Sequence, residues 1–131
     1  MTDQTIEQDI QAAGKTAPRI TPADIQANIV SEHYFTAADG EQGAYARETG
    51  HRDGIPVPES LCLLTFCVLV LRNGFTVTGE SACASLENYS EEIGRKIALA
   101  NAMSKVWPHM GYELKSVLAG NIAILHHAWA E

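Results

Sequence analysis

Two neighbouring histidines, His126 and His127, and three cysteines are the side chains of this chain that could hold a metal ion. Zinc sites use cysteine or histidine ligands at short fixed spacings, such as Cys-x-x-Cys or His-x-x-x-His. Adjacent histidines point in different directions, and four residues separate Cys62 from Cys67. The sequence therefore predicts no metal site and no cofactor, and it assigns structural or surface roles to these side chains.

The remaining polar residues form no reaction motif. Gly40, Gly43, Gly50 and Gly54 are too scattered for a phosphate-binding loop, and no Ser/His/Asp or Cys/His order is recognisable. The three cysteines, Cys62, Cys67 and Cys83, are odd in number, and the acidic, polar start of the chain does not read as a secretion signal. We expect reduced thiols and a protein that is not an enzyme.

The charge distribution and the lack of a long apolar run each argue against one class of partner. The net charge is −7, with ten acids against four bases in residues 1–60 and four of each in residues 86–119. Because no stretch is basic, we expect no binding to nucleic acid. The chain also has no apolar run near the length of a membrane span, so we expect no membrane insertion.

One group of side chains could bind a nucleotide-like molecule by charge and stacking. Its members are cationic or aromatic and lie in the C-terminal half: Arg95, Lys96, Lys105, Trp107 and Tyr112. The competing interpretation is structural. Glu91–Arg95 and Glu92–Lys96 have the spacing of ordinary pairs on a helix surface, and aromatic residues near a helix end belong more often to a core.

The elements that must position these residues begin with a β-hairpin in residues 61–83. Asn73-Gly74 favours a two-residue type I′ turn, which places Val70 opposite Val77 with both side chains buried. The first strand is apolar on both faces, which is typical of a strand covered on both sides. A second strand alone does not cover it, and a helix, an N-terminal strand or a second subunit could complete it.

Helical patterns flank the hairpin. Thr21 and Pro22 predict a helix that runs to about Glu32, and residues 33–60 read as a long loop. After the hairpin, Ser90 predicts the start of a long helix that Pro108 perturbs and Gly111 ends, followed by a helix over residues 112–119. The tail, residues 120–131, could be a strand or a short helix.

Together these patterns predict an α+β fold. Its core is an antiparallel sheet built on the hairpin, with the long C-terminal helix packed on it and an N-terminal helix beside it. Residues 1–20 are expected to form a partly flexible segment, and residues 21–131 a single domain that includes the 33–60 loop.

The order of several short motifs resembles a known family. These motifs are the residues around Asn73-Gly74-Phe75, then Gly79-Glu80-Ser81-Ala82-Cys83, Ile93-Gly94-Arg95, Trp107-Pro108 and Gly111-Tyr112. Over residues 69–118 the chain resembles the phage gene-product 49/66 family of small phage proteins. The resemblance implies a phage or prophage origin and a setting in the host cytoplasm, and it implies no particular reaction.

Two hypotheses about function follow. The first is a phage accessory protein that binds a host protein and inhibits or modulates host defence or metabolism. The second is an oligomeric sponge that sequesters a nucleotide-like small molecule between subunits. A homodimer is expected in either case, because the apolar first strand of the hairpin would otherwise leave an exposed patch.

Overall fold

The computed structural model describes residues 2–15, 17–50 and 56–120, and it divides the chain into two compact units. The central unit comprises residues 29–105, and the terminal unit comprises residues 1–28 and 106–131. The tail beyond residue 120, with His126 and His127, lies outside the described residues.

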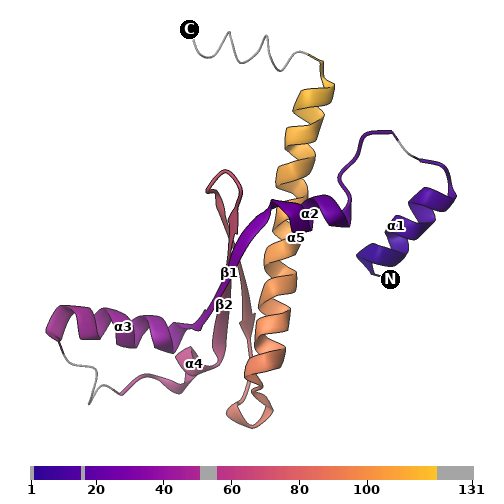
Figure 1. Ribbon diagram of the computed structural model, residues 1–131. Coiled ribbons are helices and arrows are strands. Elements are labelled where there is room, and N and C mark those ends of the chain that lie inside the picture. Colours follow the sequence, from indigo (N-terminus) through magenta and orange to yellow (C-terminus); the bar gives the residue numbers. More distant parts are fainter. Residues whose placement is uncertain (1, 16, 51–55, 121–131) are drawn as a thin grey trace, which may run out of the picture. The chain divides into compact units, whose positions relative to one another are not determined.

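The central unit contains a three-stranded antiparallel sheet in the order β1-β2-β3 (Figure 1). Its strands are β1 (Ile29–Thr36), β2 (Leu64–Leu71) and β3 (Thr76–Ala82). Helices α3 (Ala37–Thr49) and α4 (Glu59–Cys62) connect β1 to β2, and the 3-10 turn η1 (Leu86–Asn88) leads from β3 into the helix α5 (Glu91–Leu118). This is the predicted α+β architecture, with the long C-terminal helix on a hairpin-based sheet.

The hairpin turn differs from the predicted type I′ turn. Leu71 donates its N–H to the carbonyl of Phe75 at 2.9 Å, and Gly74 donates to the carbonyl of Leu71 at 2.9 Å. Gly74 has a φ of 87°, whereas no other residue type in the described chain has a positive φ. The loop is therefore a type I turn followed by a left-handed glycine. The Asn73 side chain stabilises it by accepting the N–H of Phe75 at 2.9 Å.

This turn moves the register by one residue, so the predicted pairing of Val70 with Val77 is wrong. Leu69 pairs with Val77, and Val70 pairs with Thr76. A shift of one residue exchanges the two faces of a strand. The buried face of β2 consequently carries Thr65, Cys67, Leu69 and Leu71, whereas Val70 is only half-buried on the opposite face.

Helix α5 packs unusually close to β3 at one glycine. A methyl group at Gly79 would lie 2.2 Å from the carbonyl oxygen of Ala98 and 2.3 Å from the amide nitrogen of Ala102. Both alanines are fully buried. Small side chains on the strand and on the helix thus allow the two backbones to approach, and this contact fixes α5 over the sheet.

The region before the hairpin is more ordered than the sequence predicted. The helix expected to reach Glu32 is α2 (Pro22–Asn28), and it ends where β1 begins. Residues 33–60, expected as a loop, contain the second half of β1, the whole of α3 and the start of α4. Pairing with β2 explains β1, because the β-branched and aromatic residues of this segment suit a strand.

Helix α3 begins with a capping box. Thr36 accepts the N–H of Asp39 at 3.1 Å, and the Asp39 carboxylate accepts the N–H of Thr36 at 2.9 Å. These two bonds satisfy backbone groups at the helix start. They offset the low helix propensity of Gly40 and Gly43, which had favoured a loop.

Helix α5 also differs from its prediction, because it continues through Pro108 and Gly111 to Leu118. Proline in a helix removes one backbone hydrogen bond and costs about 3 kcal/mol. The helix tolerates this cost because packing stabilises it at Ala98, Ala102 and Val106, which are fully buried. The separate helix expected at residues 112–119 is thus the last part of α5.

The terminal unit contains α1 (Asp3–Ala12), α2 and the end of α5. Thr21 caps α2 as predicted, accepting the N–H of Asp24 at 3.1 Å. Arg19 makes two hydrogen bonds to Glu7 of α1, and this guanidinium lowers the pKa of the Glu7 carboxyl to about 2. Trp107 lines a small depression together with Ile6 and Ile10 of α1.

Candidate functional site

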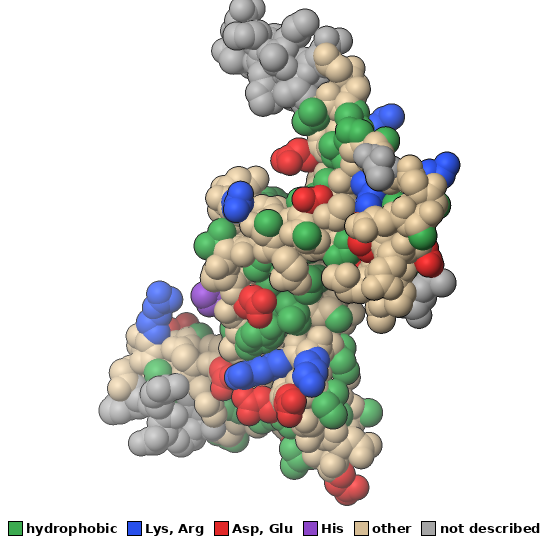
Figure 2. All heavy atoms as spheres, turned by 45° about the vertical axis from the view of Figure 1, so that its right-hand side comes forward, with side chains coloured by type: hydrophobic (Ala, Val, Ile, Leu, Met, Phe, Trp, Pro, Cys, Tyr) green, Lys and Arg blue, Asp and Glu red, His purple; other side chains and the backbone are tan. Residues whose placement is uncertain are grey.

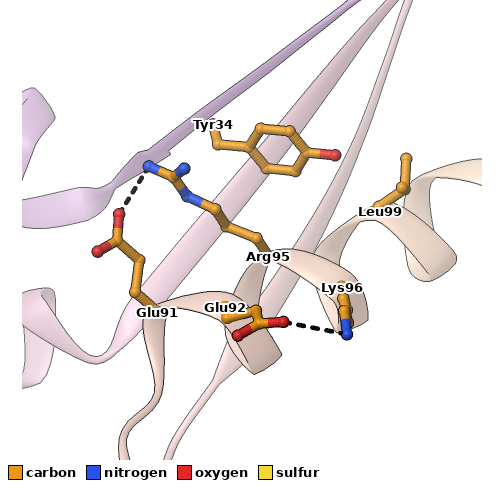
Figure 3. Close-up of a pocket in the computed structure, with 6 residues that line it drawn as sticks. All are labelled: Tyr34, Glu91, Glu92, Arg95, Lys96 and Leu99. Atoms are coloured by element: carbon orange, nitrogen blue, oxygen red, sulfur yellow. Dashed lines mark ion pairs between the residues drawn. The ribbon is translucent and has the colours of Figure 1, made fainter.

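A depression of about 590 Å³ lies between β1 and the first turns of α5 (Figure 3). Tyr34 of β1 forms one side. The other side comes from α5 and consists of Glu91, Glu92, Arg95, Lys96 and Leu99. We call this depression the β1–α5 groove. Four of its six lining side chains are charged.

Two ion pairs form the charged wall of the groove. Arg95 Nη2 lies 2.7 Å from Glu91 Oε1, and Lys96 Nζ lies 3.3 Å from Glu92 Oε1. These are the i,i+4 pairs that the sequence predicted. All four side chains are at least 47% exposed, so each pair is worth only about 0.3–0.5 kcal/mol. Figure 2 shows blue and red side chains side by side on this surface.

Tyr34 anchors the groove to the sheet. The guanidinium carbon of Arg95 lies 5.5 Å from the centre of the Tyr34 ring, within the range of a cation–π interaction. The Tyr34 hydroxyl donates a hydrogen bond of 2.8 Å to Glu32 Oε1. Burial raises the pKa of Tyr34, and the bond to Glu32 adds to this effect. The ring is therefore a neutral platform at physiological pH.

Cys67 lies behind this platform and pairs with Tyr34 across the sheet. Its side chain is fully buried, and burial raises the pKa of its thiol. A buried thiol of raised pKa is a poor nucleophile, because the thiolate is the reactive form. Cys67 thus belongs to the core, and all three cysteines are free thiols, as the sequence indicated.

The structure separates the five residues predicted to line a ligand site. Arg95 and Lys96 both line the groove. Lys105 follows Arg95 by ten residues, or about 15 Å along a helix. Trp107 and Tyr112 belong to the terminal unit.

Sequence reasoning placed Tyr34 in a loop, where it noted the aromatic residues Tyr34, Phe35 and Tyr45, but did not group it with Arg95 and Lys96. It assigned no ligand role to Glu91, Glu92 or Leu99. The signal for Tyr34 was present in the β-favouring run that begins at Ile29. That run becomes visible as a strand only once its pairing with β2 is known.

The backbone of β1 adds a second binding feature to the groove. In the described part of the chain β1 pairs only with β2. Leu71 donates its N–H to the carbonyl of Phe75, and the carbonyl of Leu63 accepts the N–H of Cys83. The backbone groups of odd-numbered residues in and next to β2 therefore point toward β3. In an antiparallel ladder the even-numbered residues of β2 then bond toward β1. It follows that the backbone groups of Glu32 and Tyr34 point to the open edge of the sheet.

A second depression, of about 260 Å³, lies on the opposite flank of α5 beside the end of β3. Its lining is mostly apolar and includes Leu63, Ile93 and Ile97. Ile93 and Ile97 are 59% and 45% exposed. The only thiol in this lining, Cys83, donates a hydrogen bond to the Ser85 carbonyl at 3.2 Å.

Within residues 2–15, 17–50 and 56–120, no cluster of three or more histidine, cysteine or acidic side chains could bind a metal ion. Among the described helices, none combines the length and the apolar character needed to span a membrane.

Comparison with known protein families gives a match over most of the chain. The model of the family described as "Phage protein (N4 Gp49/phage Sf6 gene 66) family" matches residues 20–118. This range contains both sides of the β1–α5 groove and the whole of the described sheet. No curated protein and no solved structure matches the chain.

Proposed function

The chain belongs to this family of phage proteins, and we propose that it acts by binding a host protein through the β1–α5 groove. In this role it would inhibit or modulate host defence or metabolism. We place this action in the host cytoplasm, where a phage accessory protein meets its targets.

The observation that carries this proposal is the position of the groove beside an open strand edge. Glu32 and Tyr34 direct backbone donors and acceptors outward, and an extended segment of a partner can add to such an edge as a further strand. The main-chain bonds would supply affinity. Side chains of the added strand that point toward α5 would enter the groove and supply specificity.

The charges of the groove suit a polypeptide partner. Two acids are followed by two bases along α5, so the wall is neutral as a whole. Because the ion pairs are exposed and weak, Arg95 and Lys96 can exchange their glutamates for carboxylates of a partner at little cost. A partner segment that carries both acidic and basic residues fits this wall.

Photo-crosslinking in infected cells tests the location of the binding site. A photoreactive amino acid at Lys96 should crosslink one host protein, because this side chain lies on the groove wall and is exposed. The same amino acid at Glu48, an exposed position on α3, is the matched control. Equal crosslinking of the same protein from both positions would count against the groove.

A proline substitution tests strand addition. Glu32→Pro removes an N–H that points to the open edge, and edge strands tolerate proline at such positions. We expect it to abolish capture of the crosslinked host protein. Glu32→Ala is the control, because it also removes the hydrogen bond to Tyr34 but keeps the N–H. Retained capture by Glu32→Pro would contradict strand addition.

The sponge hypothesis is the second candidate, and one observation favours it. The groove places an aromatic ring, Tyr34, next to two cations, Arg95 and Lys96. A ring for a base and cations for phosphates are the elements of nucleotide binding. A rise in melting temperature with a nucleotide ligand, lost in Arg95→Gln but kept in Lys115→Gln, would favour this candidate over the first.

A further inference from the structure

We propose that the face of the central sheet opposite α5 binds the same face of a second copy of this chain, so that the protein is a two-fold dimer. We call it the open face. It contains alternate residues of the three strands: Ser31, His33 and Phe35 of β1, Leu64, Phe66, Val68 and Val70 of β2, and Thr76, Thr78, Glu80 and Ala82 of β3.

The centre of the open face is apolar and lacks the burial of a core. Leu64, Phe66, Val68 and Val70 are all half-buried, although β2 is the central strand of the sheet. Phe35 is 39% exposed, and its ring lies 5.8 Å from that of Phe66. Helix α5 runs along the sheet and covers the other face (Figure 1).

The charges on this face identify the occupant and its orientation. On the three strands the open face carries two titratable side chains, His33 on β1 and Glu80 on β3. Strand β2 lies between them, which separates their strands by about 10 Å. Within one chain they are therefore too far apart to pair, and each is exposed at the rim of an apolar centre.

A two-fold axis parallel to β2 brings His33 of one copy close to Glu80 of the other. It lays β1 of one copy over β3 of the other. His33 then lies over Thr78 of the second copy, two residues along the strand from Glu80, so the imidazole and that carboxylate can meet diagonally. The alternative axis, perpendicular to the strands, lays β1 over β1 and β3 over β3 and brings like groups together. An apolar centre with a polar rim of complementary groups is also the usual anatomy of a specific interface.

The mass in solution is the first test, by sedimentation equilibrium at micromolar concentration. We expect twice the chain mass of 14.2 kDa. Val68→Asp, at the centre of the open face, should give a folded monomer. Thr78→Arg is a second variant on the same row, exposed on an outer strand and safe for folding. Ile97→Asp, exposed on α5, is the control that should stay dimeric.

A charge exchange tests the orientation. His33→Glu alone and Glu80→Lys alone should each weaken self-association by about tenfold, because the first places two carboxylates together and the second removes the acceptor that faces the imidazole. The double variant should restore the wild-type association constant. A wild-type protein that stays at 14.2 kDa overturns the dimer. A dimer insensitive to Val68→Asp and Thr78→Arg overturns this face, and a double variant as weak as the singles overturns this orientation.

Discussion

The two faces of the central sheet have similar apolar composition on β2 but different packing. Under α5 the side chains are small or fully enclosed. Cys67 and Leu69 have no exposed surface, and Gly79 lets the helix backbone approach the strand. On the open face the side chains of Phe66 and Val70 are larger on average and remain half-buried. The difference shows that close packing here depends on residue size and register, because hydrophobicity alone does not separate the faces.

The largest contrast is expected between aspartate at Leu69 and aspartate at Val70. Leu69→Asp buries an unpaired charge under α5, and a cost of several kcal/mol is comparable to the whole stability of a small domain. We expect this variant to be unfolded by circular dichroism. Val70→Asp should fold, with a lower melting temperature, because its neighbours leave it half-buried.

Melting curves of the two variants at matched concentration decide the comparison. If Val70→Asp unfolds the chain and Leu69→Asp does not, the register through Gly74 is wrong and Val70 faces the core. The wild-type pairing of Leu69 with Val77 predicts the opposite order.

The next largest effect concerns the contact between β3 and α5. Gly79→Ala places a methyl group against backbone atoms of Ala98 and Ala102, which cannot move aside as a side chain can. We expect destabilisation of about 1–3 kcal/mol or more from this overpacking. Gly43→Ala is the matched control on α3, where the new methyl group meets open space, and it should stabilise by up to about 1 kcal/mol.

Urea denaturation of both glycine variants measures these free energies. If both variants change the free energy of unfolding equally, α5 lies farther from β3 than the structure shows. In the structure a methyl group at Gly79 would be only 2.2 Å from the carbonyl oxygen of Ala98. If Gly79→Ala is destabilised and Gly43→Ala is stabilised, the close backbone contact between β3 and α5 is confirmed. This contact holds α5 over what we call the covered face, the face of the sheet opposite the open face.

The sequence predicted the hairpin and the starts of the helices better than it predicted the register between the paired strands. The Asn73-Gly74 turn and the capped starts of α2 and α5 depend on local residue types, and each appears where those residues indicate it. The register depends on how the Asn73 side chain bonds to Phe75. Asn73-Gly74 can form a two-residue turn or the end of a three-residue turn, and these two turns bury opposite faces of the strand.

The candidate site was less predictable for a similar reason. Arg95 and Lys96 were identified from charge and helical spacing, and both line the groove. Tyr34 reaches the groove only because β1 pairs with β2 over a long sequence separation. Trp107 and Tyr112 share helix α5 with Arg95 but belong to the other unit, whose part of the helix begins at Val106.

The rate at which each cysteine is alkylated tests whether α5 seals the covered face, and this measurement needs no substitution. Cys67 lies on the covered face with no exposed surface, whereas Cys62 and Cys83 are half-buried outside its centre. In the native protein we expect an alkylating reagent to modify Cys62 and Cys83 and to leave Cys67 unmodified. Peptide mass spectrometry after timed labelling measures this, with labelling in urea as the control for all three sites. Early modification of Cys67 would mean that α5 does not seal this face.

The smallest effect is a loss of stability at alkaline pH that originates on the covered face. Burial raises the pKa of the Cys67 thiol above its ordinary value of 9.0. The folded protein therefore holds this proton at a pH where the unfolded chain has released it. The resulting stabilisation is complete below pH 9.0 and declines as pH rises from there through the folded-state pKa.

Cys67→Ala removes the titrating group from the covered face, so its stability should fall less steeply than that of the wild type above pH 9.0. The alanine variant starts from a lower stability because it leaves a small cavity, and this offset is constant with pH. Val77→Ala, which leaves a cavity on the same face but removes no titrating group, is the matched control and should keep the wild-type slope. Urea unfolding at several values between pH 8 and pH 10.5 gives the slopes directly. Equal slopes for wild type and Cys67→Ala would mean that Cys67 titrates as it does in water, which a sealed face under α5 does not allow.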